Sequence, residues 1–517
     1  MDPVTLQVAA GALRSACEEM GAVLIRSSHS PNIKERRDCS TALFDPAGEL
    51  VMQAEHIPVH LGSMPDAVAA VLDEEQEPDA LWILNDPYRG GTHLPDITLV
   101  SPVFAPGHEG GLIGFAACRA HHADIGGQTP GGMPAFSTRL DTEGVVIGPT
   151  RADDDVLREL ASRMRNPGQR LADLRAQRAA NRIGAERLRQ LAARDGAGEL
   201  AARMDEILNY AERRTRAALE ELPDGEGVAE DALEGADGPI PLRVRATIRH
   251  DQLTLDFTGS ADQVSGNLNC PLSVTRAASF FAVRVVCDPD APPSAGAWRP
   301  IDVSAPAGSV LNARAPAAVA GGNVETSSRV ADLVIEALGT FVPVPAGGQG
   351  TMNNVTLSGG SGEGEWTYYE TIGGGQGACP DAEGPSAVHV AMSNTLNTPV
   401  EALETELPVR VRELSVRRGS GGEGRNRGGE GIVREVEALE PMRYTLIAER
   451  RTTAPRGRDG GGDGRPGRDS VDGEPIPGKA EGELVPGSRL RVETPGGGGH
   501  GTRLAGQPAQ KPHENGV

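Results

Sequence analysis

Two segments of the chain place histidine and aspartate beside glycine and proline, and together they could hold a metal ion. Residues 85–96 read N-D-P-Y-R-G-G-T-H-L-P-D, and residues 119–127 read R-A-H-H-A-D-I-G-G. A divalent cation such as Mn, Zn or Fe binds imidazole nitrogen and carboxylate oxygen together, and such a site keeps positions open for water and substrate. The candidate ligands are His93, Asp96 and His121, with Asp124 or His122 as a fourth ligand or as a residue that orients the others.

The elements around these segments predict that they meet. Residues 97–104 and 111–119 are strand candidates, and the turn-forming sequence A-P-G-H-E-G joins them into a hairpin. If the turn centres near residue 107, His93 lies opposite His121 or His122, and Asp96 lies near Arg119. The alternative is that both segments are polar loop ends whose histidines only form hydrogen bonds. The metal site therefore depends on the hairpin.

Composition limits the class of protein. A chain of 517 residues is too long for one hydrophobic core and should divide into roughly two to four packed units. Its formal net charge of −22 predicts repulsion from nucleic acid and from an anionic membrane. No stretch approaches the roughly 18 apolar residues of a membrane span, and the scattered cysteines favour a reducing compartment. We expect a cytoplasmic protein with neither nucleic acid nor a membrane as partner.

The predicted elements indicate an α+β chain of several domains with antiparallel and mixed sheets. Residues 4–25 have the apolar spacing of an opening helix, and residues 329–338 that of an amphipathic helix. Residues 242–249 alternate as a strand does, after a boundary at P-D-G-E-G, residues 223–227. We expect an N-terminal α/β part with the metal motifs (1–152), a helical arm (153–222), a central α+β domain with pocket loops (223–412) and a Gly-rich β region with a frayed tail (413–517).

Other polar residues stand in Gly-rich clusters that could line a pocket. Glycine permits close approach of the backbone, while its neighbours offer fixed hydrogen-bonding groups. Ordinary β-turns explain each cluster equally well. The two histidines of H-I-P-V-H fit a turn beside a pocket, because Pro58 between them disfavours a helix. The candidate pocket residues are His56, His60, Asn85, Asp86, His122, Asn323, Glu325, Asn353 and Glu370.

Two strings match nucleotide-binding motifs only in part. G-E-P-I-P-G-K-A at 473–480 ends in alanine where a P-loop needs a hydroxyl for Mg²⁺, and its prolines remove backbone donors. G-D-G-R-P-G at 462–467 has no predicted strand before it and no helix after it. We interpret both as turns and do not expect this chain to bind ATP through them.

Taken together, the motifs resemble the hydantoinase B/oxoprolinase family. The resemblance extends from about residue 3 to residue 502 and is specific, because long and unusual strings occur in one order. The strings that carry it are N-D-P-Y-R-G-G-T-H-L-P-D, A-H-H-A-D-I-G-G, N-L-N-C-P, P-A-A-V-A-G-G-N-V-E-T-S, G-T-M-N-N, N-T-L-N-T-P-V-E, S-G-G-E-G-R-N-R-G-G-E-G and T-P-G-G-G-G.

The resemblance implies an ATP-dependent cyclic amidase that opens a hydantoin or 5-oxoproline-type lactam. The family implies a hetero-oligomer in which a hydantoinase A-type partner binds ATP and activates the substrate, while this chain completes the hydrolysis. It assigns a metal to His93, Asp96 and His121, and Asp124 or Asp38 could move protons. Two alternatives stay open: a subunit of a ketone carboxylase of the acetone or acetophenone type, and a scaffold subunit without catalytic activity.

Overall fold

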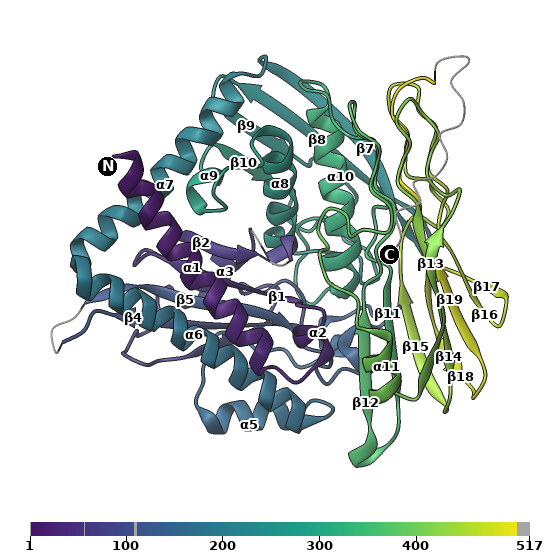
Figure 1. Ribbon diagram of the computed structural model, residues 1–517, viewed down its shortest axis with the longest axis horizontal. Helices are drawn as coiled ribbons and strands as arrows, with labels where there is room; N and C mark the ends of the chain where they lie inside the picture. Colours follow the sequence, from purple (N-terminus) through teal and green to yellow (C-terminus); the bar gives the residue numbers. More distant parts are fainter. Residues whose placement is uncertain (1, 56, 61, 108–110, 504–517) are drawn as a thin grey trace.

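The N-terminal part of the molecule is built on a six-stranded sheet. The computed structural model describes residues 2–55, 57–60, 62–107 and 111–503. Helix α1 (Pro3–Ser27) confirms the predicted opening helix and packs with α6 (Pro167–Asp195) over one face of the sheet (Figure 1). In the order β2-β1-β5-β4-β3-β6 the strands are β1 (Cys39–Phe44), β2 (Leu50–Glu55), β3 (Trp82–Leu84), β4 (Asp96–Phe104), β5 (Leu112–His121) and β6 (Thr150–Arg151).

Both faces of this sheet are buried. Along β5, Cys118 and Ala120 contribute to the core beneath α1 and α6, whereas Phe115 and Ala117 contribute to a second core shared with the middle of the chain. A strand that is covered on both faces reads as a continuous apolar run, and this is the pattern from which the hairpin was predicted. The polar end of β5 therefore lies deep inside the protein.

Helices and a second sheet form the middle of the chain. Helices α5 (Asp154–Ser162), α6 and α7 (Ala197–Glu220) confirm the predicted helical region. The four-stranded sheet has the order β10-β9-β8-β7, and α8 and α10 pack together beside it. Its elements are β7 (Gly225–Gly235), β8 (Gly238–Arg249), β9 (Gln252–Asp256), β10 (Ile301–Ser304), α8 (Leu272–Cys287) and α10 (Ser327–Leu338). Strand β8 and helix α10 confirm the strand and the helix predicted there.

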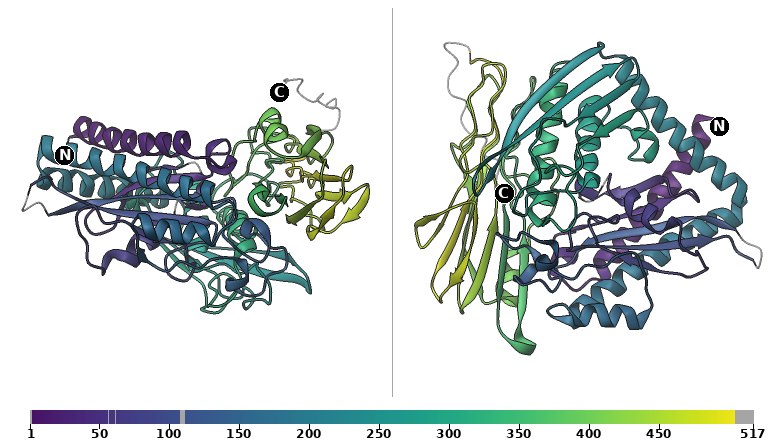
Figure 2. Two further views of the ribbon diagram at one scale, coloured as in Figure 1. Left: turned by 90° about the horizontal axis from the view of Figure 1, so that it is seen from below. Right: turned by 180° about the vertical axis from the view of Figure 1, so that it is seen from behind.

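Two further antiparallel sheets enclose a third core near the C-terminal end (Figure 2). The first has the order β12-β11-β15-β18, with β12 (Trp366–Glu370), β11 (Asn354–Gly359), β15 (Met442–Ile447) and β18 (Lys479–Leu484). The second has the order β13-β14-β19-β16-β17, with β13 (Val409–Arg417), β14 (Gly431–Ala438), β19 (Arg489–Glu493), β16 (Arg468–Val471) and β17 (Glu474–Ile476). The short helices are α2 (Pro31–Lys34), α3 (Met64–Leu72), α4 (Leu140–Glu143), α9 (Ala295–Trp298) and α11 (Val400–Glu406).

Glycine-rich segments near residues 376, 429, 462 and 497 run side by side at the end of these sheets. The backbone N–H of Gly429 donates to Gln376 O at 2.8 Å, and that of Gly497 donates to Gly429 O at 2.9 Å. A Cβ atom at Gly497 would lie 2.0 Å from Gln376 O. Glycine is required here because backbones lie where side chains would otherwise stand.

Gly497→Ala should therefore destabilise the protein. The added methyl group must displace backbone, and we expect a loss of about 2 kcal/mol in the free energy of unfolding. Urea unfolding followed by circular dichroism would measure it. Gly11→Ala is the matched control, because nothing lies within 4 Å of its Cβ and α1 should gain from the better helix former. Equal stability of the two variants would contradict the close packing.

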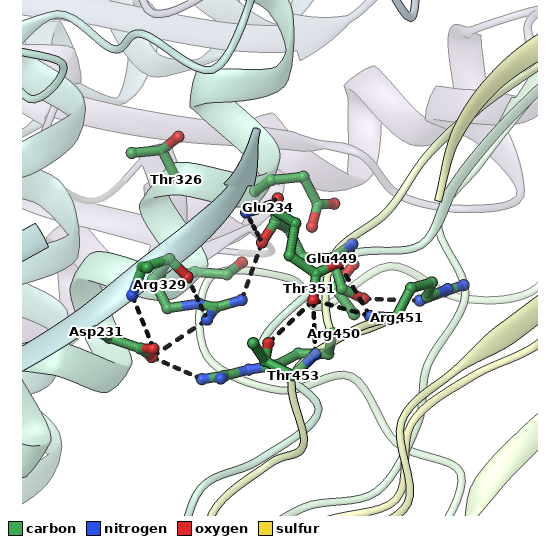
Figure 3. A network of polar contacts seen from close by, with 12 residues as sticks. Asp231, Glu234, Thr326, Arg329, Thr351, Glu449, Arg450, Arg451 and Thr453 are labelled. Carbon is green, nitrogen blue, oxygen red and sulfur yellow. Dashed lines mark hydrogen bonds and ion pairs between the residues drawn. The ribbon is translucent and has the colours of Figure 1, made fainter. Parts of the chain in front are cut away.

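Buried ion pairs join the middle of the chain to the C-terminal sheets (Figure 3). Arg329 of α10 is fully buried and pairs with Asp231 of β7 at 3.2 Å and with Glu449, just after β15, at 3.1 Å. Lys479 of β18 also pairs with Glu449. We call Asp231, Arg329, Glu449 and Lys479 the junction network.

None of the helices in the described ranges is long and apolar enough to cross a membrane. We expected the last dozen residues to be frayed, and they lie outside the described part of the chain.

Candidate functional site

The predicted hairpin is formed by β4 and β5 and brings two of the candidate ligands into register. Asp96 at the start of β4 pairs directly with His121 at the end of β5. Because the strands shift register between Val103 and Phe104, Asp96 faces His121, and Arg119 stands opposite Thr98 instead. The turn before β4 adds His93, whose carbonyl oxygen accepts from the backbone N–H of Asp96 at 3.1 Å.

His93, Asp96 and His121 form a compact buried group. Asp96 Oδ1 lies 3.1 Å from Nε2 of His93 and 3.2 Å from Nδ1 of His121. Each of the three residues offers one ligand atom, and these three atoms lie within 4.8 Å of one another. The other carboxylate oxygen, Oδ2, lies 3.4 Å from Nε2 of His60 and accepts a hydrogen bond from Thr92 at 2.9 Å. The structure thus gathers the three predicted ligands and adds His60 beside them.

The donor atoms of this group fit a divalent cation. Both ring nitrogens of His93 and Nε2 of His121 are buried and have no hydrogen-bond partner among the described residues. An unpaired buried polar atom costs about 1–3 kcal/mol, so a ligand is expected. Two atoms that bind one cation at about 2.1 Å, roughly at a right angle, lie about 3 Å apart. Nε2 of His93 and Oδ1 of Asp96 have this separation.

The protonation states also suit a cation. Burial opposes ionisation of Asp96, but the imidazoles of His93, His121 and His60 outweigh it and hold the pKa of this carboxyl well below its usual range. Burial lowers the pKa of His121 to about 4 and also lowers that of His60. At neutral pH the carboxylate of Asp96 is charged and the ring of His121 is neutral, as metal ligands must be.

A small cavity adjoins the group. It offers about 20 Å³, which is room for one water molecule or ion. A ring-shaped substrate would need the surrounding segments to open. The lining residues are Asp38, Ile57, Val59, His60, His93, Asp96, His121, Asn323, Val324, Met352, Tyr369, Thr371, Ser393 and Thr395.

Asp38 is the second carboxylate in this cavity. Burial and, next, the charge of Asp96 raise its pKa to about 7, against the opposing effects of Arg36 and His93. Its backbone carbonyl accepts from the N–H of His121 at 3.0 Å, so its position is tied to the end of β5. A carboxyl with this pKa can exchange a proton near neutral pH.

A π-helical turn, η3 (Gly322–Thr326), supplies two of the predicted pocket residues. Nδ2 of Asn323 donates to Asp96 Oδ2 at 3.4 Å, which leaves Oδ1 of Asn323 without a described partner in the cavity. Glu325 lies behind the cavity, where its Oε1 accepts from Nδ2 of Asn354 at 2.6 Å. Single π-helical turns are frequent at functional sites. This turn therefore links the carboxylate of the group to the start of α10.

Tyr369 is a site residue that the sequence did not reveal. Its ring stacks on that of His121, with centroids 4.5 Å apart and planes inclined by 15°. Its hydroxyl donates to Asn354 Oδ1 at 2.7 Å. The only sequence signal is the strand-like string W-T-Y-Y-E directly before the polar cluster at Glu370, and nothing in it distinguishes Tyr369 from a core residue.

Asp124 and His122 take other positions. The carboxylate of Asp124 accepts from the backbone N–H groups of Gly126, Gly131 and Arg165 at 2.8–2.9 Å, and from the Arg165 guanidinium at 3.1 Å. His122 Nε2 lies 2.9 Å from the Gln177 side-chain oxygen of α6. Both side chains thus have partners away from the cavity, and a catalytic part for Asp124 stays a prediction.

The remaining predicted pocket residues hold loops together. Asn85 donates to Leu94 O and Val145 O, and so fixes the segment that carries His93. Asp86 accepts from the N–H of Tyr88 in the same loop. Asn353 donates to Gln349 and to Ile372 O, and Glu370 pairs with Arg434. His56 lies outside the described residues.

The sequence model of the hydantoinase B/oxoprolinase family matches residues 2–503. The chain belongs to this family. The resemblance predicted from the motifs is thereby confirmed.

Individual members of the family match over nearly the whole chain. It is 37% identical to a 5-oxoprolinase of Dictyostelium discoideum over 97% of its own length but only 40% of that protein's. It is 32% identical to the B subunit of a putative D-/L-hydantoinase from a Pseudomonas species, over 98% of this chain and 91% of that one. The crystal structure of the ATP-dependent caprolactamase from Pseudomonas jessenii has the same fold, with a TM-score of 0.90, 28% identity, and coverage of 98% of this chain and 93% of that one.

Proposed function

We propose that this chain is the hydrolytic subunit of an ATP-dependent enzyme that opens a cyclic amide such as a hydantoin or 5-oxoproline. The observation that carries the proposal is the buried group of His93, Asp96 and His121, in which three ring nitrogens have no hydrogen-bond partner among the described residues. It occurs in a chain whose relatives are named for reactions of cyclic amides. A divalent cation, Mn, Zn or Fe, is the ligand that we assign to this group.

The chemistry divides between the cation and the side chains of the cavity. A cation held by His93, Asp96 and His121 would polarise a carbonyl group or lower the pKa of a bound water molecule. Asp38 moves a proton, because it lines the same cavity and its pKa lies near neutrality. A water molecule attacks the carbonyl carbon and gives a proton to Asp38, which passes it to the leaving nitrogen as the C–N bond of the ring breaks. Once the surrounding segments have closed again over the substrate, they exclude bulk water while this takes place.

ATP is assigned to a partner of the hydantoinase A type. Residues 462–467 lie within the glycine-rich segments, and residues 473–480 span β17 and the start of β18, so neither string forms the loop between a strand and a helix that phosphate binding needs. The similarity to a protein named as a hydantoinase subunit supports a two-subunit enzyme. The similar 5-oxoprolinase is much longer than this chain, so an ATP-binding part can belong to the same chain in that protein.

Metal content and coupled hydrolysis test the proposal together. The purified chain should contain close to one divalent cation, measured by mass spectrometry of the metals. With an A-type partner it should hydrolyse hydantoin or 5-oxoproline and consume ATP. Treatment with a chelator should abolish hydrolysis, and one of Mn, Zn or Fe should restore it.

The alternative of a non-catalytic scaffold predicts a different result. A scaffold would bind the ATPase partner equally well before and after chelation, and hydrolysis would not depend on the cation. Full hydrolysis by the metal-free pair would overturn the proposed site.

A further inference from the structure

A buried arginine beside the cavity forms no ion pair with a described carboxylate. Arg36 is 0% exposed. Its Nη2 donates to Thr371 O, Thr371 Oγ1 and Thr395 Oγ1, each at 2.9 Å. Its Nε and Nη1 have no hydrogen-bond partner among the described residues. The charge of Arg36 acts on the carboxyl group of Asp38, but the two side chains form no ion pair. A buried charge that lacks an opposite charge is strongly unfavourable.

The other fully buried arginines show how unusual this is. Arg170 and Arg329 pair with carboxylates, and all three side-chain nitrogens of Arg119 donate hydrogen bonds. Arg36 alone among these four has neither a carboxylate partner nor a full set of acceptors within the described ranges. An anion from outside the chain would supply what is missing.

A row of hydrogen-bonded side chains connects Arg36 to the cavity. Thr371 Oγ1 lies 2.7 Å from Thr395 Oγ1, Thr395 Oγ1 lies 3.1 Å from Nε2 of His389, and Nδ1 of His389 lies 2.6 Å from Ser393 Oγ. Burial, together with the nearby charge of Arg36, lowers the pKa of His389 to about 3, so its ring is neutral. We call these four residues the hydroxyl row.

Counting hydrogens shows that the hydroxyl row has a donor to spare. Three hydroxyl groups and one neutral imidazole carry one hydrogen each on these polar atoms, which makes four. The three contacts of the row use one hydrogen each, so one remains. If each group donates to the next in the order Thr371, Thr395, His389, Ser393, the remaining hydrogen lies on Ser393. If the hydrogen bonds run in the opposite order, it lies on Thr371. Both residues line the cavity.

We propose that Arg36 and the hydroxyl row form an oxyanion subsite, which receives a carboxylate or phosphoryl oxygen of the substrate beside His93, Asp96 and His121. The spare hydroxyl donates to the anion, and the charge of Arg36 lies behind it. Charge-assisted hydrogen bonds are the strong ones, and buried arginine is well suited to such recognition. The inference rests on the proposed function, which makes this cavity the substrate site.

Binding to the chelated protein tests the subsite without the cation. The probes are inorganic phosphate, 5-oxoproline with its carboxylate, and 2-pyrrolidone, which has the same ring without the carboxylate. Titration calorimetry should show that phosphate or 5-oxoproline binds at least about tenfold more tightly than 2-pyrrolidone. Preference for phosphate assigns the subsite to a phosphoryl group, and preference for 5-oxoproline assigns it to the ring carboxylate.

Variants locate the binding. Thr371→Val combined with Ser393→Ala removes both hydroxyls that can carry the spare hydrogen, and should weaken oxyanion binding by about tenfold. Thr398→Val is the matched control, because its buried hydroxyl accepts from Tyr368 and lies outside the hydroxyl row. Arg36→Lys should keep the charge and bind the oxyanion with an affinity between those of wild type and the double variant. If Arg36→Lys does not fold, the double variant decides.

Two results would overturn the subsite: equal binding of all three probes by the wild type, or oxyanion binding by the double variant that matches the wild type. These outcomes are separate from failure of the proposed function. A chain that binds an oxyanion when chelated, but never supports ATP-coupled hydrolysis, would contradict the proposed function and keep the subsite. An enzyme that is active, but whose double variant binds oxyanions as tightly as the wild type, would contradict the subsite and keep the proposed function.

Discussion

Asp96→Asn is expected to abolish binding of a divalent cation and, with it, hydrolysis by the reconstituted enzyme. The carboxylate of Asp96 is the centre of the site, because one oxygen approaches His93 and His121 and the other approaches His60 and Thr92. The amide of asparagine has no negative charge. Its NH₂ group also replaces one carboxylate oxygen, so the side chains around that oxygen lose the acceptor that they contact. Loss of a residue that only orients a ligand weakens metal binding by roughly 10–100-fold, so loss of a ligand should weaken it by about 100-fold or more. Competition with a chromophoric chelator would measure the affinity.

Two further variants show whether the effect is specific. His93→Ala should also lose the cation, because it removes a ring nitrogen that lies 3.1 Å from Asp96 and has no hydrogen-bond partner among the described residues. Asp124→Asn is the matched control: this aspartate is also buried and close in sequence, but its carboxylate is bound to backbone N–H groups of Gly126 and Gly131. It should lower thermal stability and keep the metal content. A full complement of metal in Asp96→Asn would refute the site, and loss of hydrolysis in a stable, metal-loaded Asp124→Asn would favour proton transfer by Asp124.

The part of the site that the sequence predicts is the part built by local pairing. Asp96 and His121 lie at the ends of two adjacent strands, so recognising the hairpin was enough to bring them together. The exact pairing of β4 with β5 is not predictable from the sequence, because no residue pattern indicates the register shift between Val103 and Phe104. Periodicity likewise predicted α1 and α10 well, because each has one apolar face.

The rest of the cavity comes from segments far apart in the chain. Arg36 meets Thr371 and Thr395 across 335 and 359 residues, and Tyr369 reaches His121 from a different sheet. No sequence periodicity reports such contacts. The Gly-rich C-terminal region was expected, but not that its segments pack backbone against backbone, as they do at Gly497. Composition shows that glycine is frequent, whereas only the fold shows which backbones approach each other.

Glu449→Ala is expected to destabilise the protein by about 3–5 kcal/mol, because it leaves buried charges of the junction network without their partner. Glu449 is fully buried and accepts from Arg329, from Lys479 and from the backbone N–H of Glu234. Arg329 would keep Asp231, but Lys479 would lose the only carboxylate with which it pairs among the described residues. Urea unfolding would measure the loss. A change below about 1 kcal/mol would show that water replaces the missing partner.

Removing the charge of Glu449 should also affect Glu325, which lies near the N-terminal end of the helix that carries Arg329. Burial and, next, the charge of Glu449 raise the pKa of Glu325 to about 7. A carboxyl whose pKa is raised on folding contributes a stability that is complete below its unfolded pKa and is lost as the pH rises through the folded value. The free energy of unfolding should therefore fall between about pH 5 and pH 7, and Glu449→Gln, which keeps the shape and removes the charge, should reduce this fall. If the fall is unchanged in Glu449→Gln, the junction network does not act on Glu325, and Asn323 and Glu325 are held by their own turn alone.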